Sequence, residues 1–551
     1  MNLTRFFDHW GITENPFRGE EARQDPVFMR LGVRGAEGAA LAAGPGAPAQ
    51  AGDGARPGTP PGPALPRAAH SDFEKIAGDF DRPSTSIVFG EKGSGKTAIR
   101  LQLAERVGEF NRARPRGRCL LVSYDDLNPT LDRFAERQGA TDRRASVTDL
   151  LKRLRLVDHI DALLALVVPP LIDALLGDGP GRDSAVDLEL GAEPWKAVRR
   201  LPPARRRDVL LLQAVYDRPD QAEQRTRRLR RRLRLPPRPV ALLWDALVLV
   251  GWLPAAAVLL WTSTGLPSGL LTPYGSLALA LAAAWLLVLA KRLGWDRLAW
   301  LRAGHRLRRQ VRVIGRGDRS WGASVRQLHA AGVDLSALPV TDSDDQRYAM
   351  LERVRAVLAG FGYASLIVVI DRVDEPTLIS GDPERMRAMV WPLLNNKFLQ
   401  QPGVGIKMLL PIELRHALFR ESAAFFQEAR LDKQNLIERL SWTGSMLYDL
   451  CNARLAACSD PARAPAGISG RPVTLLDLFA EDVTRQDLVE ALDQMHQPRD
   501  AFKLLYQCLL EHCSNVTEDQ AQWRIPRLIL ETVKKGQAER VRQLYRGVRP
   551  A

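Results

Sequence analysis

The sequence predicts an α/β fold in which a parallel sheet is flanked by helices, a long insertion interrupts the sheet, and a helical domain follows. Three observations predict it. Short β-rich runs alternate with stretches of helical periodicity, at residues 84–89, 119–124, 364–370 and 404–411. Residues 246–290, between the second and third runs, contain no Asp, Glu, Lys or Arg, and the pattern from residue 443 onward is helical. Because strands that alternate with helices build parallel sheets, we expect one sheet assembled from both sides of the insertion.

The composition is that of a globular protein. Of 551 residues, 26% are charged and 45% are apolar, which excludes wholesale disorder and collagen-like repeats. The 78 basic and 64 acidic side chains leave a net charge of +14. The five cysteines have neither paired CxxC spacing nor histidine partners at zinc-finger distance. The sequence therefore argues against a zinc site and a disulfide scaffold, and it favours a reducing compartment.

Two segments precede the first β-rich run. Residues 1–35 form a short N-terminal piece, whose first ten residues lack the long apolar core of a secretory signal. Residues 36–69 are dominated by Gly, Ala and Pro, and such a stretch cannot bury enough apolar surface to fold. We therefore expect residues 36–69 to be a flexible linker.

The first β-rich run leads into a loop that matches the full G-x-x-x-x-G-K-[ST] pattern. Residues 90–97 read GEKGSGKT, and Ile99, Leu103 and Val107 continue at helical spacing, so the motif has its required strand-to-helix context. The glycines let backbone N–H groups face a triphosphate at the positive end of the helix. The alternative, a glycine-rich turn that binds nothing, requires the full pattern to have arisen by chance. The residues predicted to bind nucleotide are Gly90, Gly93, Ser94, Gly95, Lys96, Thr97 and Ala98.

Side chains of two separate motifs carry the predicted chemistry. Lys96 is expected to reach the β- and γ-phosphates, and the Thr97 hydroxyl to bind Mg²⁺. A phosphate loop also needs an acidic residue at the end of a neighbouring strand. The third β-rich run leads directly into Asp371, which is placed to hold Mg²⁺ through water. Glu375, or alternatively Asp374, is then available to orient and deprotonate the attacking water. An acidic turn without a catalytic role is the other interpretation of this cluster.

The sequence also bears on which nucleotide is bound. A guanine-specific site would need an Asn-Lys-x-Asp motif, but Asn396 and Lys397 are followed by Phe398 and Leu399. This favours ATP over GTP, so the predicted cofactors are ATP and Mg²⁺.

The uncharged stretch divides into two spans of bilayer length. At the overall charge frequency of 26%, a stretch this long without a charge would arise about once in a million. Residues 242–262 and 270–290 are each long enough to cross a hydrocarbon core of ~30 Å. We expect a transmembrane helical hairpin, with a buried helical pair in a soluble core as the alternative. Residues 151–176 are also apolar, but three aspartates interrupt them, so we expect a helix packed on the body or lying along the bilayer surface.

Arginine-rich segments flank the predicted hairpin on both sides. Residues 225–238 carry eight arginines and no acid, and residues 291–319 have a net charge of +8. The positive-inside rule therefore places both flanks, both termini and the nucleotide-binding domain in the cytoplasm, with two spans in the inner or plasma membrane. Basic clusters beside a span usually meet anionic headgroups, so membrane lipid is an expected partner. Nucleic acid is the alternative, and the lack of a zinc finger or an RNP-like aromatic motif argues against it.

These motifs together resemble a known family. The phosphate loop, the apolar strand and the acidic cluster DRVDE at residues 371–375 resemble the STAND group of AAA-like P-loop ATPases, although Arg372 stands where that group typically has a small residue. A membrane hairpin between the two nucleotide motifs is similar to the KAP branch of the group. The resemblance covers roughly residues 84–130 and 341–445, and it implies a P-loop NTPase sheet followed by a C-terminal helical lid. A weaker match, ENPF at residues 14–17, resembles the opening of AAA-like secretion-pathway ATPases.

Two arginines are candidate sensors by this resemblance alone. Pro498-Arg499-Asp500 resembles the PRD element of AAA-like and STAND-like lids, which implies that Arg499 lies near the γ-phosphate. A surface arginine after a helix-initiating proline is the alternative interpretation. Arg415, shortly after the fourth β-rich run, is the other candidate.

The chain is thus expected to have eight segments: N-terminal segment (1–35), linker (36–69), first half of the NTPase domain (70–130), helical insertion with basic flank (131–239), transmembrane hairpin (240–291), basic juxtamembrane segment (292–340), second half of the NTPase domain (341–442) and C-terminal helical lid (443–551). The favoured function is a membrane-anchored ATPase that works as a conformational switch. A motor subunit of a membrane-bound assembly or secretion complex, acting as a homo-oligomer, and a nucleotide-binding scaffold are the alternatives. The protein partner is not indicated by the sequence.

Overall fold

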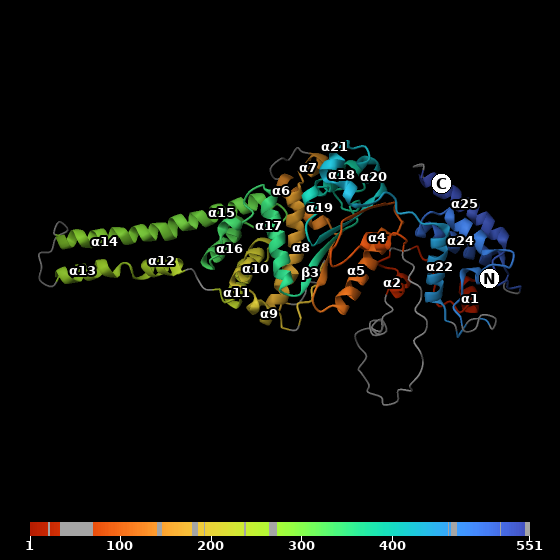
Figure 1. The fold of residues 1–551 in the computed structure, drawn as a ribbon, viewed down its shortest axis with the longest axis horizontal. Helices are drawn as coiled ribbons and strands as arrows, with labels where there is room; N and C mark the ends of the chain where they lie inside the picture. The colour runs from red at the N-terminus through yellow and green to blue at the C-terminus, as the bar shows by residue number, and fades with distance from the viewer. Residues whose placement is uncertain are drawn as a thin grey trace, which may run out of the picture.

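The computed structural model shows a central α/β unit, with a long helical hairpin projecting from one end and a helical unit at the other (Figure 1). It describes residues 1–19, 22–32, 70–139, 146–178, 186–191, 193–235, 239–263, 273–460, 462–463, 465, 471–517 and 520–545. The predicted linker at residues 36–69 lies outside the described residues.

A five-stranded parallel sheet forms the centre of the molecule. Its strands are β1 (Ser86–Gly90), β2 (Arg118–Tyr124), β3 (Tyr363–Ile370), β4 (Val404–Pro411) and β5 (Asn435–Ile437). Their order is β2-β3-β4-β1-β5, and all four pairings are parallel. The predicted α/β sheet built from both sides of the insertion is therefore confirmed. Strand β5 was not predicted, because three residues are too few to show a strand pattern.

Alternate side chains of the strands point to opposite faces of the sheet, and both faces are covered by helices. Val88 and Ile367 pack against the helices of one face, whereas Ile87 and Val368 pack against those of the other. Burial on both faces explains why the strands read as continuous apolar runs. The first face carries α4 (Phe73–Ala77) and α5 (Lys96–Ala113). The second carries α6 (Asn128–Gly139), α8 (Leu156–Leu176), α17 (Asp344–Ala359), α18 (Pro383–Val390) and α20 (Ile412–Leu418).

The insertion between β2 and β3 contributes a helical layer over the second face. Helix α8 lies at its centre and contacts β2, α10 and α17, so the prediction that this apolar helix packs on the body is confirmed. The other helices of the layer are α7 (Val147–Leu151), α9 (Pro194–Arg200), α10 (Pro203–Tyr216), α11 (Ala222–Arg232) and α16 (Asp318–Ala330). Two shorter helices occur later in the chain: α19 (Asn396–Leu399) between β3 and β4, and α21 (Ala423–Ala429) between β4 and β5.

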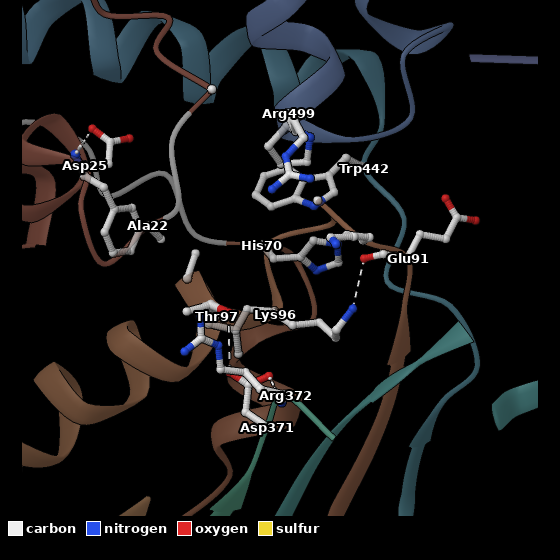
Figure 2. Close-up of a pocket in the computed structure, with 18 of the residues that line it drawn as sticks. Ala22, Asp25, His70, Glu91, Lys96, Thr97, Asp371, Arg372, Trp442 and Arg499 are labelled. Carbon is white, nitrogen blue, oxygen red and sulfur yellow. Dashed lines mark hydrogen bonds between the residues drawn. The ribbon is translucent and has the colours of Figure 1, made fainter. Parts of the chain in front are cut away.

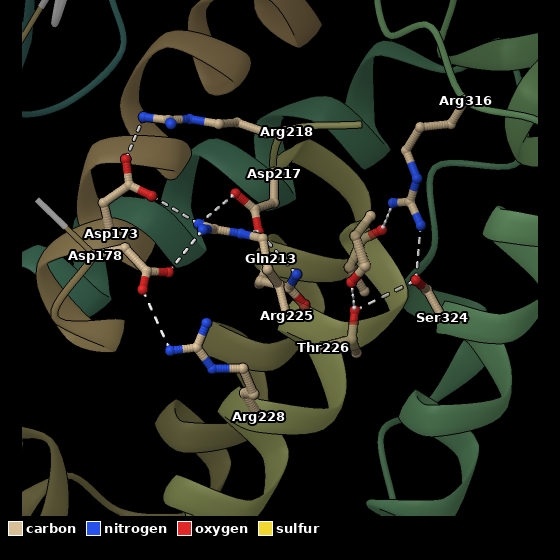
Figure 3. A network of polar contacts seen from close by, with 12 residues as sticks. Asp173, Asp178, Gln213, Asp217, Arg218, Arg225, Thr226, Arg228, Arg316 and Ser324 are labelled. Atoms are coloured by element: carbon tan, nitrogen blue, oxygen red, sulfur yellow. Dashed lines mark hydrogen bonds and ion pairs between the residues drawn. The ribbon is translucent and has the colours of Figure 1, made fainter. Parts of the chain in front are cut away.

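Most of the described arginines in the segment at residues 225–238 form ion pairs or hydrogen bonds inside this layer. Arg225, on α11, is buried and forms ion pairs with Asp173 at 2.8 Å, Asp178 at 3.0 Å and Asp217 at 2.8 Å (Figure 3). Arg228 pairs with Asp178 at 3.2 Å. Asp173 on α8 and Asp178 after its end lie 52 and 47 positions before Arg225, whereas Asp217 follows α10 only 8 positions before it, just outside the segment whose charges were counted. Much of this segment therefore stabilises the fold.

Two helical arms form the projecting hairpin. The first arm consists of α12 (Pro239–Val250) and α13 (Leu253–Ser263), and the second begins with α14 (Pro273–Leu289). A π-helical turn (Ala290–Trp295) joins α14 to α15 (Asp296–Gln310) without a break. Three helices in the described part of the chain are long and apolar enough to span a membrane: α8 and one in each arm. The helix α8 is 72% buried within the fold, whereas each of the other two is only 6% buried.

The C-terminal helices and the N-terminal segment share one hydrophobic core. The C-terminal helices are α22 (Gly444–Cys458), α23 (Arg485–Asp493), α24 (Pro498–Asn515) and α25 (Arg527–Tyr545), and the N-terminal ones are α1 (Leu3–His9) and α2 (Pro26–Gly32). Phe6, Phe17 and Val27 are buried among side chains of α22 and α24. The N-terminal segment thereby lies beside the carboxyl ends of the strands, where the cavity described below opens.

Candidate functional site

The glycine-rich loop between β1 and α5 has the backbone conformation that its glycines predict. Gly93 and Gly95 have φ angles of 100° and 95°, which side-chain-bearing residues rarely adopt. A Cβ atom on Gly93 would also lie 3.0 Å from Gln497 Oε1 and 3.1 Å from Arg499 Cβ. Both glycines therefore serve the turn, and Gly93 also allows the close approach of α24.

Lys96 is the first residue of α5, and its amine points back toward the loop. The Nζ atom donates hydrogen bonds to the carbonyl oxygens of Gly90 at 2.7 Å and Glu91 at 2.9 Å (Figure 2). Burial lowers the pKa of this amine, and the charges of Asp371, Asp374 and others nearby oppose that shift. The arrangement holds a cation at the inner edge of the loop.

Thr97 and Asp371 meet although 274 positions separate them. The Thr97 hydroxyl donates to Asp371 Oδ2 at 3.4 Å, and Asp371 is only 1% exposed. Burial raises the pKa of this carboxyl, and the nearby charges of Arg100 and Lys96 oppose that rise. The prediction that the acid ends a strand neighbouring that of the loop was wrong in detail, because β4 lies between β1 and β3. The two sites still meet, since all parallel strands end at the same edge of the sheet.

A cavity of about 500 Å³ opens at this edge. Successive connections leave the adjacent strands β1 and β4 in opposite directions, toward β2 and β5, and ligands of open α/β sheets bind at such a switch point. Three parts of the chain line the cavity: the loop and strand ends, the N-terminal segment through Ala22, Asp25 and Phe28, and the C-terminal helices through Leu450 and Phe502.

Side chains from the C-terminal unit reach the glycine-rich loop. Trp442, just before α22, donates its indole N–H to the Ser94 carbonyl at 2.8 Å, and Gln497 donates to a Glu91 carboxylate oxygen. Arg499, at the start of α24, lines the cavity beside Trp442 (Figure 2). The structure therefore brings this predicted residue to the site. The other candidate, Arg415, pairs with Glu438 at 2.6 Å and does not line the cavity.

The acidic cluster after β3 lines the same cavity. Arg372 has a φ angle of 60°, and its N–H donates to Asp371 Oδ1 at 2.9 Å, which fixes the carboxylate. Its side chain pairs with Glu375 through Nε at 3.0 Å, and the Glu375 side chain is 52% exposed. Asp374 also lines the cavity. All the predicted phosphate-loop, metal and acidic residues thus lie in one region.

Several residues of the site were missed by sequence reasoning. Glu413 lines the cavity just after β4, and its position after a buried strand, like that of Asp371, could have indicated it. Arg100 contacts Asp371 from α5. It follows Thr97 at helical spacing, and this could have indicated that the two side chains lie on the same side of the helix. Trp442 and Phe28 had no signal, because they reach the site only through tertiary packing.

No protein-family model, no curated protein and no solved structure matches this chain. Function is therefore inferred from the residues and geometry of the cavity.

Proposed function

We propose that this chain is a membrane-anchored P-loop ATPase of the STAND-like type, which binds and hydrolyses ATP with Mg²⁺. The convergence of Lys96, Thr97 and Asp371 at the mouth of one cavity carries the proposal. A cavity of about 500 Å³ lies within the usual range of ~300–1,000 Å³ for small-ligand sites. The buried hydroxyl of Ser94 has no hydrogen-bond partner among the described residues, which supports a polar ligand at the loop.

The donor set supports Mg²⁺ as the metal. Proteins hold Mg²⁺ with one or two carboxylates, waters and the phosphates of the substrate. Thr97 and Asp371 supply one hydroxyl and one carboxylate on facing elements, and Asp371 is a buried acid that gains from a cationic partner. When bound, the metal would neutralise charge on the β- and γ-phosphates.

Part of the cavity lining is suited to a purine base. Phe28, Leu450 and Phe502 give this region an apolar lining, while His70 and Asp25 add polar groups. His70 is fixed because its Nε2 donates to the Ser441 carbonyl at 2.8 Å. The glycine-rich loop and these apolar side chains line one pocket, which supports a ligand with an anionic part and a flat apolar part.

We assign the base to Glu375 and the γ-phosphate contact to Arg499. Glu375 lines the cavity and is half-exposed, so its carboxylate can accept a proton from an attacking water. Arg372 holds Glu375 by an exposed ion pair, which is weak enough to rearrange. Asp374 is the second candidate base, because its carboxylate also lines the cavity. Arg499 would place a positive charge where charge develops in the transition state.

The hairpin supports a location in a membrane. Leu249 is 75% exposed and Leu287 is 72% exposed, and burying a leucine side chain is worth about 1.5–3 kcal/mol. At the base of the hairpin Arg292 pairs with Asp245 at 2.6 Å, and Lys291 lies over the Trp244 ring at 3.4 Å. Basic and tryptophan side chains at this position are typical of a membrane–water interface.

Lipid headgroups would meet α15 rather than α11. Arg297, Arg302 and Arg306 on α15 are exposed and have no ion-pair partner in the described part of the chain. The α11 arginines, by contrast, are mostly paired internally, as Arg225 is. Basic residues beside a span attract anionic lipid by about 1 kcal/mol each when they lie near the surface.

The proposal is tested by nucleotide binding and hydrolysis on the full chain in detergent. Wild type should bind ATP in a Mg²⁺-dependent way and release phosphate. Glu375→Gln should keep binding and lose hydrolysis, and Asp374→Asn should affect hydrolysis less. A wild-type chain that binds ATP and shows no hydrolysis above that of Glu375→Gln would instead identify a nucleotide-binding scaffold.

A further inference from the structure

Arg100 occupies an unusual place beside the proposed metal site. It lies one turn after Lys96 on α5, and only 5% of the residue is exposed. Its Nε atom is 3.3 Å from Asp371 Oδ2, and its Nη1 atom donates to Asp125 Oδ2 at 2.6 Å. The oxygen of Asp371 that Arg100 approaches is also the one that faces the Thr97 hydroxyl. A protein cation therefore sits against the same oxygen that is expected to hold Mg²⁺.

Two carboxylates depend on this guanidinium. Asp371 and Asp125 follow the adjacent parallel strands β3 and β2, so the strand pairing brings their charges together. Asp125 has a second cation, Arg23, whose side chain is 40% exposed. For Asp371, Arg100 is the one ion-pair partner within the described residues. Buried charges without such a partner are strongly destabilising.

The guanidinium also has unused hydrogen-bonding capacity. Its Nε and Nη2 atoms are buried and make no hydrogen bond within the described residues, and the 3.3 Å contact of Nε with Asp371 is an ion pair only. Arg100 is therefore firmly bonded to Asp125 and loosely held at Asp371. This asymmetry would let it keep the first contact and release the second.

We propose that Arg100 is a placeholder cation, which neutralises Asp371 until ATP delivers Mg²⁺ and then remains paired with Asp125. This role rests on the proposed function, and it makes metal binding conditional on nucleotide. With Arg100 in place, a divalent ion that arrives alone must displace a bound cation. With triphosphate present, the phosphate oxygens add ligands that Asp371 alone does not supply.

The experiment measures binding of Mn²⁺ without nucleotide, by loss of the free-ion electron paramagnetic resonance signal, on the full chain in detergent. Arg100→Gln should bind Mn²⁺ at least ten-fold more tightly than wild type, because it uncovers the Asp371 carboxylate. Arg23→Gln is the matched control, since it removes an equal charge from Asp125 and leaves Asp371 covered. It should bind Mn²⁺ as wild type does. Arg100→Gln combined with Asp371→Asn should lose the gain.

Folding of each variant is checked by its thermal unfolding transition. If Arg100→Gln does not fold, Arg100→Ala is used, because the smaller side chain admits water to the two acids. Equal Mn²⁺ affinity in wild type and a folded Arg100 variant would overturn the placeholder role. Binding of an ATP analogue to wild type is measured in parallel. ATP binding without the Mn²⁺ gain overturns the role of Arg100 alone, whereas a wild type that binds no ATP overturns the proposed function.

Discussion

Lys96 is held by two carbonyl oxygens of its own loop, and this contact shows where an incoming phosphate would have to compete. Replacing Lys96 by alanine should reduce ATP affinity about 100-fold, because a charge-assisted hydrogen bond is worth about 1.5–3 kcal/mol and this amine is expected to make more than one. Equilibrium binding of a fluorescent ATP analogue measures the effect. Lys433→Ala, which removes an exposed lysine that does not line the cavity, is the control and should bind as wild type does.

Trp442 joins the C-terminal unit to the loop through a single hydrogen bond to the Ser94 carbonyl. Trp442→Phe keeps the ring but removes the donor, so ATP affinity should fall about five-fold, as expected for about 1 kcal/mol. The same titration detects it. An unchanged affinity in a stably folded variant would show that this contact does not position the loop.

His159 provides a pH test of the buried core. Burial lowers its pKa to about 4, whereas an unfolded histidine titrates near 6.5. Because only the unfolded state binds the proton between these values, stability should fall as pH drops from about 6.5 to 4, by up to about 3 kcal/mol. His159→Gln should show a shallower loss in thermal unfolding measured against pH.

At the scale of elements, the crossing of α15 and α16 depends on two glycines. A Cβ on Gly304 would lie 2.7 Å from Gly322 N and 2.8 Å from Asp318 O, both backbone atoms that cannot move independently. Gly304→Ala should therefore destabilise the protein by about 1–3 kcal/mol. Gly536→Ala, in the interior of α25 with open space around it, should stabilise it by about 0.5–1 kcal/mol. Opposite shifts in the two melting temperatures are the expected result.

The hairpin is the element that we propose to lie in the bilayer, because its two helices are long and apolar enough to span it and are mostly exposed. Deletion of residues 240–291 should release the chain to the soluble fraction and leave ATP binding within a factor of two, because none of the described residues of this segment lines the cavity. Membrane fractionation and nucleotide titration measure the two effects. Tight membrane association after the deletion would contradict this assignment and implicate α8, the other apolar helix.

Elements were predictable where a local pattern specifies them. Four strands, the phosphate loop and the helical character of the hairpin arms are visible in apolar runs and glycine spacing. Partners that come from distant segments were not predictable. The arginine-rich segment at 225–238 counts as a free basic patch in the sequence, yet Arg225 is paired with Asp173 and Asp178, which lie 52 and 47 positions away. Likewise, β4 lies between β1 and β3 in the sheet, and no local sequence pattern indicates the order of the strands.

At the scale of the whole molecule, one cavity is built by three parts that the sequence separates widely. The N-terminal segment is locked to the C-terminal helices by Arg454, which pairs with Asp25 at 2.7 Å and donates to the Pro16 carbonyl at 2.7 Å. Both parts line the cavity with the sheet. The proposed switch requires that a nucleotide bind one arrangement of these parts and the sheet more tightly than another. The hairpin lies at the opposite end of the molecule from this contact (Figure 1).

The most direct measurement of the central claim is the affinity of the full-length chain for a fluorescent ATP analogue, with and without Mg²⁺, in wild type and Asp371→Asn. If the loop and the distant acid share one triphosphate, Mg²⁺ should tighten binding at least ten-fold in wild type and much less in the variant. Equal Mg²⁺ enhancement in the two proteins, or no binding by either, would contradict the account.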